Sequence, residues 1–158
     1  MDFGFTNDPT TMIAVYKYDG KLIFDEVLYR KGLRNSDIAR LIKDYRCEIF
    51  ADSAEPKSIS DLKSYGLRIK GADKGADSIR YGISLLQEQE FLVTSTSINL
   101  INELKSYIWK KDKTGSGTLK PIDAFNHCID AMRYFAMMTL NKKESSIKIK
   151  RRSRRTVW

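Results

Sequence analysis

Runs of apolar and β-branched side chains at the start of the chain predict strands. Residues 2–5, 11–18 and 21–29 each form such a run, and Asp19 and Gly20 separate the last two. An Asp-Gly pair between two runs of this kind is a strong signal for a two-residue β-hairpin. We therefore expect the chain to open with a three-stranded antiparallel meander.

After residue 30 the pattern changes to helices that alternate with short strands. Apolar residues spaced three and four apart predict helices over residues 35–45, 58–65, 76–89, 98–107 and 123–140, the last capped by Asp123. Short apolar runs predict strands over residues 48–51, 67–70 and 91–94. This order predicts an α/β fold, in which a mixed sheet carries helices on both faces. The polar, glycine-containing sequence over residues 110–120 predicts a mobile loop or a flexible hairpin.

Length and charge divide the chain into a body and a basic tail. The net charge of the 158 residues is +8, and residues 141–158 hold eight lysines and arginines against one glutamate. We expect residues 1–140 to form one domain, and the tail to be a flexible arm that binds a polyanion. A solubilising tail, or the stub of a longer chain, is the alternative. No apolar run approaches the roughly 20 residues that span a bilayer, so we expect no membrane association.

Three acids stand inside otherwise apolar runs, and they carry the main indication of chemistry. Asp2 lies in the first predicted strand, Asp52 ends the strand over 48–51, and Asp130 lies in the last predicted helix. An unpaired buried carboxylate is costly. Three such acids therefore suggest one shared site, in which divalent cations offset their charge. Two such ions close together suit the hydrolysis of a phosphodiester bond.

Each acid also has a simpler interpretation. Asp2 alone is typical of a terminal strand residue near solvent, and Asp52 of a strand-end turn that caps the next helix. Asp130 is less easily explained in this way, because apolar residues surround it in the predicted helix. A salt bridge to Arg133 or Arg80 would still satisfy it.

His127 precedes Asp130 by three positions, which places both on one face of the predicted helix. It either assists the metal site or a proton transfer, or it is a core histidine with satisfied hydrogen bonds. Asp8, Glu55 and Asp123 are secondary candidates, for which surface or capping roles explain the sequence equally well.

Five short motifs follow one another along the chain. They are residues 2–9, residues 50–56, residues 74–79, Trp109 with Asp112 and Gly115, and residues 127–134. In this order and spacing they resemble the nuclease domain of the large terminase subunit of tailed bacteriophages. Each motif alone is weak, but together they are specific, and the resemblance covers most of residues 1–140.

The resemblance implies a ribonuclease H-like fold and a two-metal endonuclease that uses Mg²⁺ or Mn²⁺. Such an enzyme cuts concatemeric double-stranded viral DNA during genome packaging. Asp2, Asp52 and Asp130 fall on the family's catalytic, metal-binding acids. His127 falls on a histidine found near the site in some members.

The segment over residues 110–120 is similar to the family's hairpin beside the active site. In that case Lys110, Lys111 and Lys113 would contact DNA phosphates. The implied partners are the ATPase part of the terminase, the small terminase subunit and the portal, in the cytoplasm of the bacterial host. The chain contains no G-x-x-x-x-G-K-[ST] loop and starts one residue before the first acid. We therefore expect an excised domain, or a split or truncated gene product, with the ATP-driven step performed elsewhere.

Two other functions fit the same sequence. The first is a resolvase or recombinase on the same fold, which would prefer branched DNA over linear duplex. The second is a non-catalytic packaging module that binds DNA or the portal through its basic arm.

Overall fold

The structure, a computed structural model, describes residues 1–111 and 117–140. In this part of the chain the elements follow one another as β1 (Thr10–Tyr18), β2 (Lys21–Arg30), α1 (Asn35–Ile42), β3 (Ile49–Ala51), α2 (Pro56–Ser64), β4 (Ile69–Gly71), α3 (Ser78–Gln87), β5 (Phe91–Val93), α4 (Ile98–Ser106), β6 (Trp109–Lys111), β7 (Gly117–Pro121) and α5 (His127–Thr139). The predicted basic tail, residues 141–158, lies outside the described residues.

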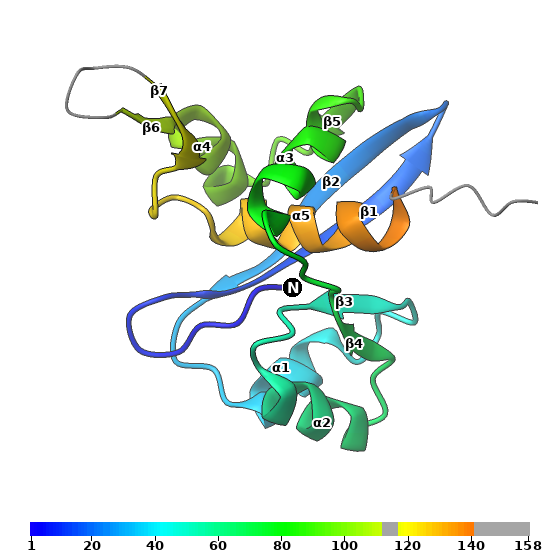
Figure 1. The fold of residues 1–158 in the computed structure, drawn as a ribbon. Helices are drawn as coiled ribbons and strands as arrows, with labels where there is room; N and C mark the ends of the chain where they lie inside the picture. Colours follow the sequence, from blue (N-terminus) through cyan, green and yellow to red (C-terminus); the bar gives the residue numbers. More distant parts are fainter. Residues whose placement is uncertain (112–116, 141–158) are drawn as a thin grey trace, which may run out of the picture.

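A long β-hairpin and the last helix form the centre of the fold. β1 and β2 pair antiparallel, and α5 lies across them (Figure 1). The turn between the two strands has positive φ at Asp19 (47°) and Gly20 (75°). Such φ values at both central residues are what a two-residue hairpin turn requires. The predicted Asp-Gly hairpin is therefore confirmed.

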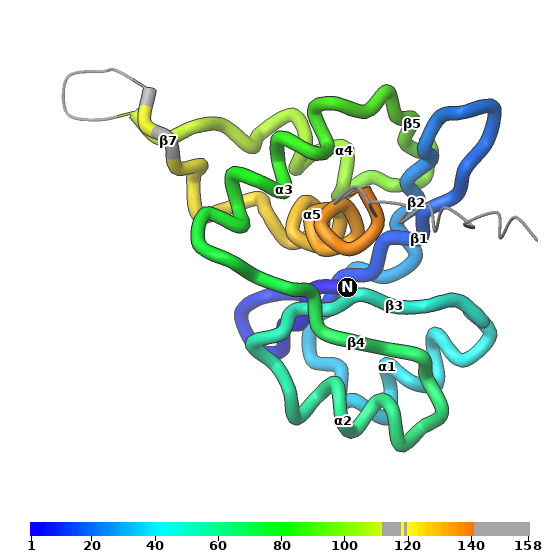
Figure 2. The backbone as a smooth tube through the Cα atoms, turned by 45° about the vertical axis from the view of Figure 1, so that its right-hand side comes forward, coloured from blue at the N-terminus to red at the C-terminus, as the bar shows by residue number. Residues whose placement is uncertain are grey.

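The strands form a mixed arrangement with helices on both sides. β2 also pairs parallel with β5, so the sheet β1-β2-β5 is mixed, while β3 and β4 form a separate parallel pair. Figure 2 shows β3 and β4 between α5 on one side and α1 and α2 on the other. α3 and α4 pack against α5 from the opposite side. The predicted α/β fold with helices on both faces is confirmed, and α5 contacts most of its parts.

The first strand of the predicted meander is not formed. Asp2 and Thr11 exchange two backbone hydrogen bonds of 2.9 Å, but this pair is an isolated bridge. Beyond it, the Thr10 hydroxyl bonds to Gly4 N (3.3 Å) and Gly4 O (2.7 Å) in place of a ladder. The chain bends so tightly that a Cβ on Gly4 would lie 2.4 Å from the carbonyl oxygen of Asp8. A tight loop therefore replaces the strand, and only Asp2 remains aligned with β1.

The last helix begins later than predicted. α5 starts at His127 after Asn126, and Asp123 is exposed outside it. The backbone of Phe125 has a φ of 55°, a left-handed conformation that ends any helix coming from Asp123. The predicted capping role of Asp123 is wrong, and Asp130 lies in the first turn of α5.

Two apolar clusters fill the interior, one on each side of the β-hairpin. The first joins β1 and β2 to α1, α2 and the β3–β4 pair. The second joins β2 to α3, α4 and α5, and Phe24 at its centre packs edge-on against Phe91 and Phe135, with ring centroids 5.2 and 6.0 Å away. No helix in the described part of the chain is long and apolar enough to cross a membrane.

Candidate metal centre

The side chains of Asp2 and Asp52 meet at one tyrosine hydroxyl. Tyr134 on α5 donates a hydrogen bond of 3.0 Å to Asp52 Oδ2, and its oxygen lies 3.4 Å from Asp2 Oδ1. The bridge to Thr11 holds Asp2 beside β1, and Asp52 directly follows β3. Burial and the neighbouring carboxylate charges raise the pKa of the Tyr134 hydroxyl. The hydroxyl therefore stays protonated and joins two of the three predicted acids.

Asp130 lies one turn before Tyr134 on α5. Its Oδ1 accepts hydrogen bonds from Arg133 Nε (2.9 Å) and Nη2 (2.7 Å), so the predicted alternative of a salt bridge to Arg133 is confirmed. Burial raises the pKa of Asp130, and the charge of Asp2 raises it further although Arg133 opposes both. The charge of Asp2 therefore acts on Asp130.

His127 bonds to the first acid. Its Nδ1 lies 3.3 Å from Asp2 Oδ2, and its Nε2 lies 3.5 Å from Asp8 Oδ1. The hydrogen bond to Asp2 is the main cause that raises the pKa of His127, while burial opposes it. We call Asp2, Asp52 and Asp130 the acid cluster. The structure thus places both His127 and Asp8 at its edge.

Asp52 has a lysine partner. Lys74, from the segment between β4 and α3, forms an ion pair with Asp52 Oδ1, which also accepts a bond of 2.7 Å from Ala54 N. Burial acts to raise the pKa of Asp52, but the bonds from Lys74, Ala54 and Tyr134 outweigh it, so the pKa is lowered. The Lys74 ammonium also lies 4.9 Å from the centroid of the Tyr134 ring.

Each of the three acids therefore has a basic partner among the described residues. Lys74 pairs with Asp52, Arg133 with Asp130, and His127 with Asp2. In this arrangement, no three acid, histidine or cysteine side chains among residues 1–111 and 117–140 form a group that could hold a metal ion.

The chemistry of the donor set nevertheless fits hard divalent cations. Carboxylate oxygens are the ligands that Mg²⁺ prefers, and Mn²⁺ accepts them as well. Asp2 and Asp52 already contact the same hydroxyl, and Arg133 engages only Oδ1 of Asp130. The three carboxylates therefore suit divalent cations by their chemistry.

Glu103 of α4 anchors the start of α5. Its Oε2 accepts hydrogen bonds from Cys128 N (2.8 Å) and Ile129 N (3.2 Å), whereas Asn126 makes no side-chain cap bond. Glu103 is 3% exposed, and its Oε1 is buried without a partner in the described part of the chain. Burial raises the pKa of Glu103, and the two N–H bonds oppose this. This carboxylate sets the position of the helical turn that carries His127 and Asp130.

A cavity of about 420 Å³ opens beside Asp130. It lies between the start of α3, the β6–β7 hairpin and the start of α5, and its basic lining residues are Arg80, Lys110 and Lys120. Lys111 is exposed on β6 next to Lys110, whereas Lys113 lies outside the described residues. The cavity thus connects the third acid with basic side chains.

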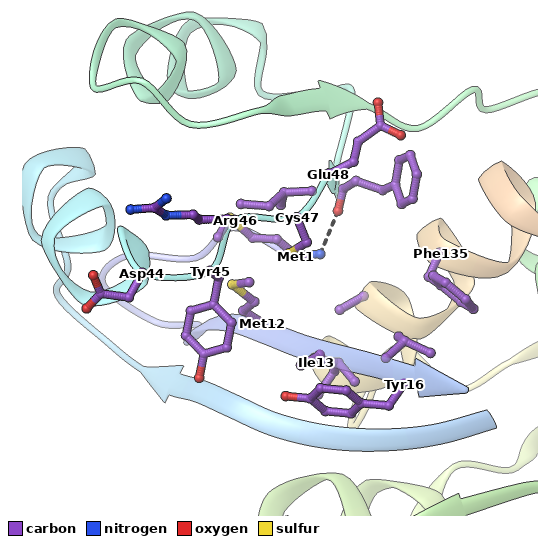
Figure 3. Close-up of a pocket in the computed structure, with 15 residues that line it drawn as sticks. Met1, Met12, Ile13, Tyr16, Asp44, Tyr45, Arg46, Cys47, Glu48 and Phe135 are labelled. Atoms are coloured by element: carbon purple, nitrogen blue, oxygen red, sulfur yellow. Dashed lines mark hydrogen bonds between the residues drawn. The ribbon is translucent and has the colours of Figure 1, made fainter. Parts of the chain in front are cut away.

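A second cavity, of about 460 Å³, is lined in part by Met1. Figure 3 shows its lining from β1, the α1–β3 connection and α5, with Met12, Tyr45 and Phe135 among the side chains. None of the three acids lines it, and its walls are mainly apolar. It is therefore separate from the acid cluster.

The remaining secondary acids have local roles. Glu55 precedes α2, and its Oε2 accepts a bond of 3.4 Å from Ser58. Asp123 lines the 420 Å³ cavity from its rim. Neither belongs to the acid cluster.

Lys74, Tyr134 and Glu103 were not predicted to belong to the site, and Arg133 was predicted only in the alternative that it pairs with Asp130. Lys74 and Tyr134 stand within motifs of the resemblance, and Arg133 stands one turn after Asp130, so local signals for these three were present. No local signal marks Glu103, because its role arises from the packing of α4 against α5.

Comparisons with known proteins agree with this architecture. The family described as "Terminase RNAseH like domain" matches residues 2–137. The large terminase subunit of Bacillus phage SPP1 is 35% identical over 144 residues, which cover 85% of this chain and 34% of that protein. This chain spans about a third of the length of the curated relatives it matches.

Solved structures of large terminases resemble this fold. The nuclease domain of the SPP1 large terminase, solved with bound Mn, matches with a TM-score of 0.75 and 30% identity, over 84% of this chain and 80% of that one. The large terminase of a thermophilic bacteriophage, solved in complex with ADP, matches with a TM-score of 0.69 and 24% identity, over 89% of this chain and 38% of that one. With its ribonuclease H-like fold, the chain belongs to the terminase RNase H-like domain family.

Proposed function

We propose that this chain is a metal-dependent endonuclease domain that cleaves concatemeric double-stranded viral DNA during genome packaging. One observation carries the proposal: Asp2 and Asp52 meet at Tyr134, on the same helix as Asp130. The relationship to the SPP1 large terminase and its Mn-bound nuclease domain supports it.

Asp2, Asp52 and Asp130 are the residues that would hold two Mg²⁺ or Mn²⁺ ions. When bound, such ions activate a water molecule and stabilise the leaving oxygen of the phosphodiester. The protein's part is to keep the three carboxylates together. Tyr134 holds Asp52 beside Asp2, and Arg133 orients Asp130 by engaging one of its two oxygens.

His127 has a supporting role in this proposal. Through Nδ1 it orients Asp2, and its raised pKa lets it carry a proton at the edge of the site near neutral pH. We assign it to orientation and to proton transfer, and we leave ion binding to the three acids.

Basic residues would hold the DNA. Lys110 and Lys111 are exposed at the base of the hairpin, and Lys110 lines the cavity that reaches Asp130. Together with Lys113 and the basic tail over residues 141–158, they supply phosphate contacts with little sequence preference.

The proposed partners follow from the longer relatives. Because the matched large subunits are about three times as long as this chain, we propose that it works with the ATPase part of a terminase. The small terminase subunit and the portal complete the proposed assembly, in the cytoplasm of the bacterial host.

A plasmid assay tests the proposal. Supercoiled plasmid is incubated with the protein in Mg²⁺, Mn²⁺ or a chelator, and DNA binding is measured in parallel. We expect nicking and linearisation with either ion and none with the chelator. Asp130→Asn should abolish cutting and retain DNA binding. The matched control is Asp37→Asn, which removes an acid near the start of α1, and it should cut like the wild type.

Other outcomes would select the other functions. Unchanged nicking by Asp130→Asn would remove Asp130 from the mechanism. A strong preference for branched over linear DNA would indicate a resolvase. DNA binding without cutting under any condition would indicate a non-catalytic packaging module.

A further inference from the structure

Lys74 places a positive charge within the acid cluster. Its ammonium pairs with Asp52 Oδ1 and lies over the ring of Tyr134, whose hydroxyl joins Asp52 to Asp2. It thus contributes positive charge at the point where two carboxylates converge. A divalent ion that binds Asp52 through Oδ1 must compete with this ammonium.

The other strong base in the cluster is held much more firmly. The Arg133 side chain is 3% exposed, and it makes two bonds to Asp130 and a third, of 3.4 Å, to the carbonyl of Ser78. Its stem packs on α3 so closely that a Cβ on Gly82 would lie 3.0 Å from Arg133 Cβ. Arg133 is therefore held both by its hydrogen bonds and by the contact between α3 and α5.

Lys74 has the opposite properties. It lies in the segment between β4 and α3, its side chain is 29% exposed, and its ammonium pairs with Asp52. A lysine stem of four methylene groups swings into solvent at little cost, and the ammonium is strongly hydrated there. Lys74 can therefore leave its acid far more easily than Arg133 can.

We propose that Lys74 is a displaceable counter-cation of Asp52. Its ammonium holds Asp52 in the metal-free protein and moves away from the carboxylate when a divalent ion binds. This inference rests on the proposed function, because it requires that Asp52 binds metal. If Lys74 plays this role, its positive charge offsets the carboxylates before any ion arrives. The same charge lowers the affinity of the site for metal.

Calorimetric titration of the metal-free protein with Mn²⁺ tests the inference without any measurement of cleavage. Lys74→Met should bind Mn²⁺ about three- to tenfold more tightly than the wild type, since the ion no longer breaks a partly exposed ion pair. A residue with a merely structural role would give the opposite sign, because its loss would loosen the site. Lys74→Gln should behave like Lys74→Met.

Lys70 provides a matched control. Its ammonium pairs with Glu48 at 2.8 Å and lies 5.1 Å from the centroid of the Phe50 ring. Lys70→Met therefore removes the same charge and the same kinds of contact without touching Asp52. We expect its Mn²⁺ affinity to stay within about twofold of the wild type, since an exposed charge away from the site is largely screened by salt.

Thermal unfolding gives a second readout. Without metal, Lys74→Met should unfold at a lower temperature than the wild type, because Asp52 loses its counter-charge, and saturating Mn²⁺ should remove the difference. Unchanged or weaker Mn²⁺ binding by both Lys74 variants, with normal binding by the wild type, would overturn the role of Lys74 alone. Absence of Mn²⁺ binding by the wild type would overturn this inference together with the metal site.

Discussion

Arg133 binds Asp130 through two nitrogen atoms that converge on one carboxylate oxygen, at 2.7 and 2.9 Å. The two residues are three positions apart on α5, and the arginine is almost fully buried against α3. The pair fixes the orientation of Asp130 and leaves its second oxygen free of Arg133. The orientation of Asp130 therefore depends on a largely buried ion pair.

Arg133→Met should destabilise the metal-free protein strongly. Removing one partner of a buried ion pair leaves an unpaired buried charge, which costs about 3 kcal/mol of unfolding free energy. Urea unfolding in the presence of a chelator measures this loss. The control is Arg40→Met, which breaks the exposed pair with Asp37 and should cost less than about 1 kcal/mol. Equal, small losses for both variants would contradict the importance of the Arg133–Asp130 pair.

Tyr134→Phe should weaken the metal-free protein by about 1–2 kcal/mol, because Asp52 loses a donor and the contact between the two acids is broken. The aromatic ring and its packing stay in place, so the change isolates the hydroxyl. The same unfolding measurement applies. Tyr65, an exposed tyrosine after α2, supplies the control Tyr65→Phe, for which we expect no measurable change. A Tyr134→Phe protein as stable as the wild type would show that the hydroxyl does not hold the acids together.

Glu103→Ala should destabilise the protein by about 2 kcal/mol, because the N-terminus of α5 loses its cap. Glu103→Gln retains an oxygen that accepts the bonds from Cys128 N and Ile129 N, and should recover most of this loss. Hydrogen exchange of these two amides should rise in the alanine variant and stay near wild type in the glutamine variant. If both variants were equally destabilised, the carboxylate charge and not the cap would be the cause.

The His127–Asp2 pair predicts a pH dependence of stability. The hydrogen bond to Asp2 raises the pKa of His127 above its ordinary value of 6.5, so folding favours the protonated ring. The contribution of the pair is therefore complete below pH 6.5 and is lost as the pH rises through the raised pKa. In metal-free protein, the stability lost in His127→Gln should be larger at about pH 5.5 than at about pH 8.5. A loss that is the same at both values would exclude a charged His127 in the folded state.

Local patterns predicted the elements that carry the acids better than they predicted how the acids meet. The apolar run before Asp52 and the helical spacing around Asp130 were enough to place each acid on its element. Tyr134 lies 82 positions after Asp52 and 132 positions after Asp2 in the sequence. Its contacts with both acids depend on how α5 packs on β1 and β3. The catalytic and metal-binding roles of the three acids stay predictions.

The two wrong boundaries both arise from side-chain hydrogen bonds. Residues 2–5 have the composition of a strand, but the Thr10 hydroxyl takes over the backbone groups of Gly4 and ends the pairing after Asp2. α5 does not start at Asp123, because Glu103 on a different helix supplies the cap. In both places a side-chain hydrogen bond overrides the local propensity of the chain.

A crystal soaked with Mn²⁺ tests the central claim that three acids from separate segments form one cation site. Anomalous scattering locates the ions independently of any cleavage assay. We predict manganese peaks within ligand distance of Asp2, Asp52 and Asp130, with the Lys74 ammonium moved away from Asp52. Manganese bound elsewhere on the protein, with the three carboxylates still paired only to Lys74, Arg133 and His127, would contradict the claim.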